Sequence, residues 1–372
     1  MLNGVDLAAR EALAEQIRED SWEAQLSIGV QARPGPGGRC RVDTEPMRLG
    51  SSRVARSFTL HQGQDTGNGS KPAPSGAGEC LDPVGSVLVG LGACVADNVV
   101  ARLTAEGCHL TFLEVVPAVE PADAGDGTRL SYGVRIEGEV SAEQARRAVL
   151  AAGERGSGHR TLEDPNEIRV VVQTEQDVHL TARPAAPRAT TARRRAARVA
   201  WEVGAHVIAE VDGVRAESDQ PKQLFGADIA PSAQEYFLSA LAGEALRFAA
   251  GADGAGPPPA ADDAGGPGPQ DAVHASGRID LRGPYSTQDA PAGLRNILVQ
   301  LLPADPSAKD DDGGPAEAVR GWLAEGEALR LIRDAHPIRV DVVLNGTPIA
   351  TGPEGAVAAT APHDTKEQHS AP

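Results

Sequence analysis

Four cysteines, Cys40, Cys80, Cys94 and Cys108, are the residues of this sequence best suited to nucleophilic or redox chemistry. They are too few for a disulfide-scaffolded secreted domain, and no two of them form a CxxC pair. None lies beside a pair of histidines at ligand spacing, and the adjacent Cys108 and His109 lack further partners. We therefore expect no metal site and no cofactor, so that any chemistry would come from a thiol.

Cys94 lies in a long apolar run that predicts a buried helix over residues 82–107, with Asp82 as its N-cap and Pro83 in its first turn. The thiol would lie about 11 residues, or ~16 Å, from the helix start, which is too far for the helix dipole to activate it. Apolar neighbours such as Val87 and Leu91 should raise its pKa by desolvation. A reactive Cys94 therefore needs a nearby cation. The alternative is a small buried side chain in a core helix.

Composition restricts the classes of function. The chain has 372 residues, a formal net charge of -17 and 41% hydrophobic residues, which suggests two domains of ordinary size with real cores. The acidic balance argues against nucleic-acid and anionic-membrane partners, and three Trp, three Tyr and five Phe are too few for a base-stacking platform. The first 20 residues do not resemble a signal peptide, and Asp97 and Asn98 interrupt the apolar run at 84–100 before it could span a membrane. We expect a cytoplasmic protein.

Several segments rich in Gly, Pro or charge divide the chain. Residues 62–79 predict a flexible loop, 176–195 a linker, 251–272 a disordered insert, and 351–372 a flexible tail. The basic run at 193–195 is interpreted as part of a solvated linker.

Between these breaks one order of elements occurs twice. In the first half, the patterns predict strands at 25–30 and 56–61, a helix at 82–107, strands at 110–119 and 129–140, a helix at 141–154 and a strand at 167–173. In the second half, they predict strands at 199–211, a helix at 232–251, strands at 275–283 and 294–302, a helix at 316–336 and a strand at 338–344. Such a repeat indicates a duplicated α+β domain.

Residues 219–244, DQPKQLFGADIAPSAQEYFLSALAGE, contain a D-x-P…L-x-G-x-D…P loop that leads into E-Y-x-L-x-A-L-A-G, and residues 277–283, GRIDLRG, follow. In the first half, residues 82–100 carry a similar helix that contains Cys94. These runs resemble the OsmC/Ohr family. Cys94 falls at the position of that family's peroxidatic cysteine, and Glu244 occupies the same position in the second half.

The resemblance implies an α+β fold in which two long helices lie at the centre of an intertwined dimer. With both copies in one chain, it implies an intramolecular pseudo-dimer that is monomeric. The domains would be residues 1–175, which carry Cys94, and residues 196–350, with Glu244 in place of the cysteine.

The family uses an arginine from the N-terminal strands and a glutamate early in the helix beside its cysteine. The best matches to that arginine are Arg41 and Arg215, and Glu235 matches the glutamate, whose first-half place is taken by Val84 or Gly85. Cys94, Arg215 and Glu235 could therefore form one composite site across the two halves. Each arginine could equally be a solvated strand residue.

The family's second, resolving cysteine should follow the second helix, where this sequence has Ser157 and His159. Cys80, in the loop before the helix, is a candidate substitute for it, whereas Cys108 is too far along the helix. We interpret His159 as a surface-loop residue rather than a catalytic base.

The resemblance implies a thiol-dependent peroxidase of the antioxidant type, in which Cys94 reduces an apolar organic hydroperoxide and an external thiol completes the cycle. Two alternatives stay open. One is a non-catalytic scaffold that binds a small molecule, and the other is a repurposed enzyme acting on a sulfur-containing small molecule.

Overall fold

The computed structural model describes residues 1–35, 39–63, 80–122, 127–185, 193–250, 271–305 and 314–351. The structure does not describe residues 64–79 of the expected loop, 251–270 of the expected insert, 352–372 of the expected tail or 186–192 of the expected linker. The described part is a mixed α+β structure, as the sequence predicts.

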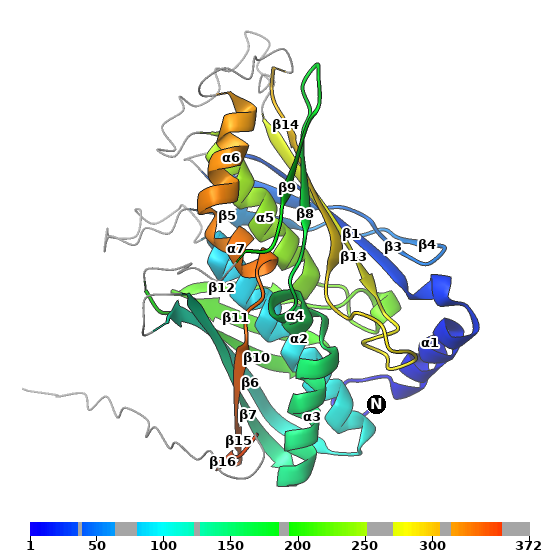
Figure 1. Ribbon diagram of the computed structural model, residues 1–372. Helices are drawn as coiled ribbons and strands as arrows, with labels where there is room; N and C mark the ends of the chain where they lie inside the picture. Colours follow the sequence, from blue (N-terminus) through cyan, green and yellow to red (C-terminus); the bar gives the residue numbers. More distant parts are fainter. Residues whose placement is uncertain are drawn as a thin grey trace, which may run out of the picture.

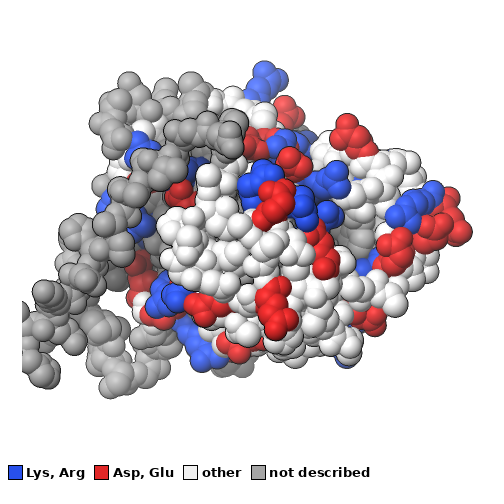
Figure 2. Space-filling view, turned by 90° about the horizontal axis from the view of Figure 1, so that it is seen from below, with Lys and Arg blue, Asp and Glu red and all other residues white. Residues whose placement is uncertain are grey.

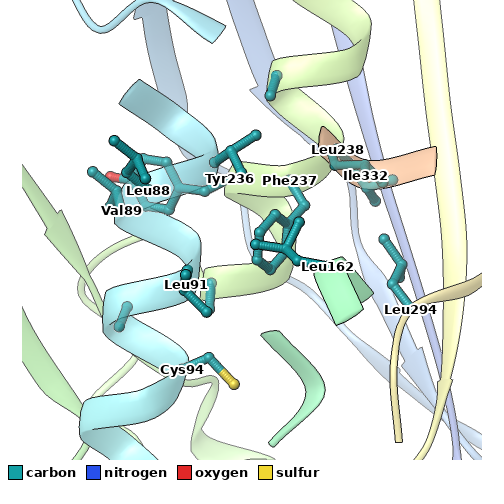
Figure 3. Packing of buried hydrophobic residues seen from close by; sticks show 14 of the residues in the cluster. Leu88, Val89, Leu91, Cys94, Leu162, Tyr236, Phe237, Leu238, Leu294 and Ile332 are labelled. Carbon is teal, nitrogen blue, oxygen red and sulfur yellow. The ribbon is translucent and has the colours of Figure 1, made fainter. Parts of the chain in front are cut away.

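Two β-sheets enclose a pair of helices, α2 (Pro83–Ala105) and α5 (Ala233–Ala249) (Figure 1). Helix α5 packs on the first sheet, α2 packs on the second, and the two helices pack against each other. Gly90 allows this close approach, because a Cβ there would lie 2.8 Å from the Ala233 carbonyl oxygen. Figure 3 shows Leu88, Val89 and Leu91 of α2 beside Tyr236 and Phe237 of α5.

The first sheet has the strand order β4-β3-β1-β13-β14-β8-β9, and β2 joins β1 to β5 at its side. Its strands are β1 (Gln25–Pro34), β2 (Cys40–Thr44), β3 (Met47–Leu49), β4 (Ser52–Val54), β5 (Thr59–Gln62), β8 (Ile168–Val172), β9 (Val178–Ala182), β13 (Ala272–Asp280) and β14 (Arg295–Leu302). The second sheet has the order β12-β11-β10-β6-β7-β15-β16. Its strands are β6 (His109–Pro121), β7 (Thr128–Glu139), β10 (Arg195–Val203), β11 (His206–Val211), β12 (Val214–Ser218), β15 (Ile338–Leu344) and β16 (Thr347–Ile349).

Each sheet combines strands from both halves of the chain. In the first sheet, β1 pairs antiparallel with β13, so that Gln25 lies opposite Asp280, and β14 pairs parallel with β8. In the second sheet, β10 pairs antiparallel with β6, and β7 pairs parallel with β15. The two sheets thus repeat one order of pairings, with the halves exchanged.

The remaining helices pack mainly against the central pair. They are α1 (Leu7–Glu19), α3 (Ala142–Arg155), α4 (Ser157–Glu163), α6 (Pro315–Glu325) and α7 (Glu327–Arg333), with the 3-10 turns η1 (Ser21–Ala24) and η3 (Lys222–Leu224). Helices α3 and α4 meet at Gly156, and α6 and α7 meet at Gly326. The prediction of one continuous helix at 316–336 is therefore wrong.

The predicted start of α2 is confirmed. The Asp82 side chain accepts a hydrogen bond from the Gly85 N–H, and Pro83 is in the first turn. Within the described residues, α2 is the one helix that is long and apolar enough to cross a membrane, but 89% of its apolar window is buried inside the protein. It serves as a core helix, as its apolar circumference predicts.

Residues 176–195 are not wholly a linker. They include β9, which adds to β8 at the edge of the first sheet, and the first residue of β10. That residue, Arg195, is buried and pairs with Asp82 and Asp212. The interpretation of the basic run 193–195 as solvated is therefore wrong for Arg195, because its guanidinium lies beside the N-cap of α2.

Candidate functional site

Cys94 lies in the middle of α2 and is buried, with 2% of its surface exposed. Its side chain points from α2 toward the chain that begins α4 (Figure 3). Gly158 makes that approach possible, because a Cβ at Gly158 would lie 2.7 Å from the Cys94 Cβ. A glycine in α4 therefore allows the backbone to contact the thiol.

Three polar groups surround the Cys94 sulfur. The Gly158 N–H donates to Sγ at 3.0 Å, and the Asn98 Nδ2 donates to it at 3.5 Å. The Ser157 hydroxyl lies 3.4 Å from Sγ. A buried thiol that packs only as a small apolar side chain needs no such donors. These groups favour negative charge on the sulfur.

Burial nevertheless raises the pKa of the Cys94 thiol, and the nearby Asp97 carboxylate raises it further. The hydrogen bonds from Ser157, Gly158 and Asn98 act in the opposite direction and offset part of this effect. Within the described residues, no arginine or lysine donates a hydrogen bond to Sγ. The resting thiol is therefore mostly protonated at neutral pH.

A small cavity of about 40 Å³ lies next to Cys94. One wall is polar and is formed by Arg10, Asp97, Asn98, Ser157, Gln220 and Gln234. The other wall is mostly apolar and is formed by Leu26, Leu224, Ile279, Leu281, Pro284 and Tyr285. Helices α1, α2, α4 and α5 and the end of β13 all contribute, so the cavity is built from both halves of the chain.

Arg10 is the cation of this cavity. Its guanidinium lies 3.9 Å from the Asp97 carboxylate and 5.4 Å from the centre of the Tyr285 ring. Burial raises the pKa of Asp97, although Arg10 opposes that shift. Gln234 from α5 donates to the Ser157 hydroxyl at 2.8 Å and so connects the second half to the groups around the thiol.

The structure does not bring the predicted arginines to Cys94. Arg41 on β2 is 56% exposed and pairs with Asp43, and Arg215 on β12 is 66% exposed and pairs with Glu217. Neither lines the cavity. Both strands turn these side chains toward solvent, so the solvated interpretation holds for them.

Glu235 is buried, but it belongs to a different cluster. It caps the start of α5 through Ser232, and the Arg56 guanidinium lies 3.5 Å from its carboxylate. Arg56 also pairs with Asp228 at 3.2 Å. The predicted composite site of Cys94, Arg215 and Glu235 is therefore not assembled. The side chain that reaches the cavity from this part of α5 is the adjacent Gln234.

His159 is not a surface-loop residue, so that interpretation is wrong. It lies in α4 with 5% of its surface exposed, and its Nδ1 lies 3.1 Å from the Tyr132 hydroxyl. Burial lowers its pKa, although Glu163 opposes that shift. Ser157, at the position expected for the resolving thiol, does lie against Cys94. Cys80 and Cys108 do not line the cavity.

A second constellation surrounds Glu244, which lies in α5 and is buried. Its carboxylate accepts from the Trp322 indole N–H, the Ala328 N–H and the Leu329 N–H, each at 2.9 Å. The last two belong to the first turn of α7. A cavity of about 330 Å³ lies beside it, lined by Asp82, Pro83, Val84, Glu244, Arg247, Phe248, Glu325 and Glu327.

Sequence reasoning missed most of the cavity. Asp97 and Asn98 carried a signal, because they follow Cys94 by three and four positions and so lie on the same side of a helix. Arg10, Gln220 and Tyr285 carried none, because their approach depends on how distant segments pack.

Two other properties bear on the kind of site. Among the described residues, no group of three or more His, Cys, Asp or Glu side chains could hold a metal ion. On the face in Figure 2, basic and acidic side chains lie close together rather than in one large patch of a single sign.

The comparisons with known proteins found no relative. Models of known protein families give no match to this sequence, and neither do curated proteins.

Proposed function

We propose that this chain is a thiol-dependent, peroxidase-like enzyme that reduces hydroperoxides through Cys94 alone. The observation that carries the proposal is the set of three polar groups on a buried sulfur, next to a cavity with a polar wall. Hydrogen bonds to Sγ stabilise the thiolate that attacks and the oxygenated sulfur that results.

The fold supports an intramolecular pseudo-dimer of two OsmC-like halves. The order of helices and strands recurs, each half contributes strands to both sheets, and the central helices α2 and α5 pack together. Only the first half has a cysteine at the repeated helix position, since Glu244 occupies it in the second. The proposed enzyme therefore has one thiol site per chain.

In the proposed step, the Cys94 thiolate attacks one peroxide oxygen. An S–O bond forms as the O–O bond breaks, and the electron pair leaves on the alkoxide, which takes up a proton to give the alcohol. The thiol is thereby oxidised to a sulfenic acid, and the peroxide is reduced by two electrons. Asp97 lines the same cavity, and burial raises the pKa of its carboxyl, so it is suited to carry the thiol's proton to the leaving oxygen.

An external thiol completes the proposed cycle, because no second cysteine lines the cavity. Its first molecule displaces water from the sulfenic acid and forms a mixed disulfide. A second molecule then attacks that disulfide, regenerates Cys94 and leaves as the oxidised external disulfide.

Comparison of Cys94→Ser with Cys40→Ser tests this function. Both cysteines are buried, but Cys40 lies in β2 and does not line the cavity. We expect Cys94→Ser to abolish peroxide consumption in an assay with added thiol and Cys40→Ser to retain it. If Cys94→Ser consumes peroxide at the wild-type rate, the proposal is wrong.

The second candidate is a non-catalytic scaffold that binds a small molecule. It is favoured by the raised pKa of Cys94 and by the lack of a cation that donates to its sulfur within the described residues. Under this alternative, dimedone should trap no sulfenic acid on Cys94 after peroxide treatment of the folded protein.

A further inference from the structure

The Gln220 side chain in the wall of the Cys94 cavity has an unused acceptor. Its Nε2 donates to the Asp97 carboxylate at 3.4 Å, which directs its Oε1 away from that contact. This Oε1 is buried and has no hydrogen-bond partner among the described residues, and the residue as a whole is 9% exposed. Buried acceptors are nearly always paired, so this one points to a donor group on a molecule that enters the cavity.

The size of the cavity limits what that molecule can be. About 40 Å³ exceeds the ~10–15 Å³ that one water needs but is too small to enclose an aromatic ring or a long alkyl chain. The apolar wall is already packed, since Leu26, Ile279 and Leu281 are buried. The ring of Tyr285 lies against Arg10, which is itself paired with Asp97.

We infer that the Cys94 site takes small hydroperoxides whose O–O–H group donates to Gln220 Oε1, with hydrogen peroxide the preferred member. This inference rests on the proposed function and names its substrate class. It departs from the expectation of an apolar organic hydroperoxide, because the groups nearest the sulfur are polar and the cavity is too small to enclose a large apolar tail.

In this assignment, Gln220 positions the substrate, and Cys94 reacts with it. The thiolate attacks one oxygen of hydrogen peroxide, the S–O bond forms and the O–O bond breaks. Hydroxide leaves with the electron pair and takes the thiol's proton to become water, so that Cys94 becomes a sulfenic acid. Accepting the O–O–H hydrogen orients the peroxide without withdrawing electrons from it.

The first test uses the unmodified protein and three oxidants: hydrogen peroxide, tert-butyl hydroperoxide and cumene hydroperoxide. The measured quantity is the second-order rate constant for loss of the free Cys94 thiol. Each sample is quenched and unfolded in dimedone before the peptide that contains Cys94 is analysed, so that access to the cavity does not limit the trapping of sulfenic acid. We expect hydrogen peroxide to react at least about tenfold faster than cumene hydroperoxide. The larger oxidant should lose both access to the cavity and the hydrogen bond to Gln220 Oε1. Equal rates, or a faster reaction with cumene hydroperoxide, would overturn the inference and leave the proposed function standing. If no oxidant modifies Cys94, the proposed function itself fails.

The second test compares Gln220→Leu with Gln62→Leu. Gln62 is also a buried glutamine with an unpaired Oε1, but it hydrogen-bonds Ser86 and Ser239 away from this cavity, so it is a matched control. We expect Gln220→Leu to slow oxidation by hydrogen peroxide about tenfold and Gln62→Leu to leave it unchanged. Methylthiolation of Cys94 by methyl methanethiosulfonate, which forms a mixed disulfide and has no donor for Oε1, should keep its rate in both variants. If Gln220→Leu reacts with hydrogen peroxide at the wild-type rate, Gln220 does not position the substrate.

A third variant tests the size limit. Leu224→Ala removes an apolar side chain from the cavity wall. We expect it to raise the rate with cumene hydroperoxide severalfold and so to raise the ratio of that rate to the rate with hydrogen peroxide. If the rate with cumene hydroperoxide does not rise, the cavity wall does not set the preference.

Discussion

Cys94 and Glu244 occupy corresponding places in the two central helices, but their surroundings differ. Each side chain faces the first turn of a short helix that follows a glycine break. The thiol accepts from one backbone N–H, that of Gly158, whereas the carboxylate accepts from those of Ala328 and Leu329 and also from an indole. One place holds a carboxyl group that accepts three hydrogen bonds, and the other holds a thiol with three polar neighbours.

In the proposed function, this difference separates a structural site at Glu244 from a reactive one at Cys94. At Glu244, the protein's own donors satisfy the carboxylate, so that it stabilises the start of α7. At Cys94, the cavity keeps an unpaired acceptor on Gln220 and a thiol that can gain oxygen. We therefore expect mutation of Glu244 to reduce mainly the stability of the protein and mutation of Cys94 to reduce mainly its reactivity.

Replacement of Glu244 should have the largest effect on stability. Glu244→Leu leaves two backbone donors and the Trp322 indole unpaired in the core, so we expect a loss of about 3–5 kcal/mol in the free energy of unfolding. Glu244→Gln keeps an acceptor and should lose less. Urea denaturation measures both, with Cys94→Ser as the comparison, which should lose far less. A loss below about 1 kcal/mol for Glu244→Leu would contradict the structural role.

Gly158→Ala should disturb the Cys94 site through its backbone contact. The added Cβ would lie 2.7 Å from the Cys94 Cβ and 3.2 Å from Sγ, so either α2 or α4 must move. We expect about 2 kcal/mol of destabilisation and a change in the thiol's alkylation rate. Gly133→Ala is the control, because a Cβ at Gly133 has nothing within 4 Å. Similar effects from both variants would contradict the tight contact at Gly158.

The pH dependence of Cys94 alkylation should separate this thiol from an ordinary one. Because burial raises its pKa, the thiolate fraction is small at neutral pH and increases with pH until the pH exceeds that raised value. We expect alkylation by iodoacetamide to quicken about tenfold per pH unit, with no plateau near the ~8.5 of a free cysteine. Mass spectrometry of the Cys94 peptide, with a cysteine-containing reference peptide, gives the profile. A plateau near neutral pH would indicate a cation beside the sulfur.

The smallest effect concerns His159, which lies beside the thiol's helix but outside the cavity lining. Its pKa is lowered in the folded state by burial, so folding favours the neutral form. The folded state therefore loses stability as the pH falls through the unfolded-state value of about 6.5. His159→Gln removes this titration, so its unfolding free energy should decrease less between about pH 7 and 5, by on the order of 1 kcal/mol. Parallel urea titrations at the two pH values test this. Parallel decreases in both proteins would contradict it.

Local signals in the sequence predicted the secondary structure well but not the tertiary contacts. The Asp82-Pro83 start and the apolar circumference of α2 were sufficient to predict a buried helix, because capping and burial depend on nearby residues. The division of the helix expected at 316–336 was missed. The first turn of α7 is satisfied by Glu244, which is distant in the sequence and whose contact cannot be read from a helical pattern.

The candidate site shows the same limit. The burial of the helix that carries Cys94 was predicted from local hydrophobicity. The family pattern indicated Ser157 only as the residue at the place of the resolving cysteine, and its contact with Cys94 was not predicted. Arg41 and Arg215 were predicted as the best matches to the family's arginine, but strand alternation turns both toward solvent. Arg10 and Gln220 reach the cavity only after the halves have packed, and no local pattern specifies that packing.

The exchange of strands between the halves has a consequence for how this chain acquires its structure during synthesis. The strand β1 is translated early, but its partner β13 begins only at Ala272, and β14 must pair with both β13 and β8. The strands of the first half therefore cannot complete the first sheet while the ribosome is still making the second half of the chain. Folding of the first sheet must wait until most of the chain has emerged, so the unpaired edge of β1 is exposed to aggregation and to chaperones for longer than in a protein whose domains fold one after the other.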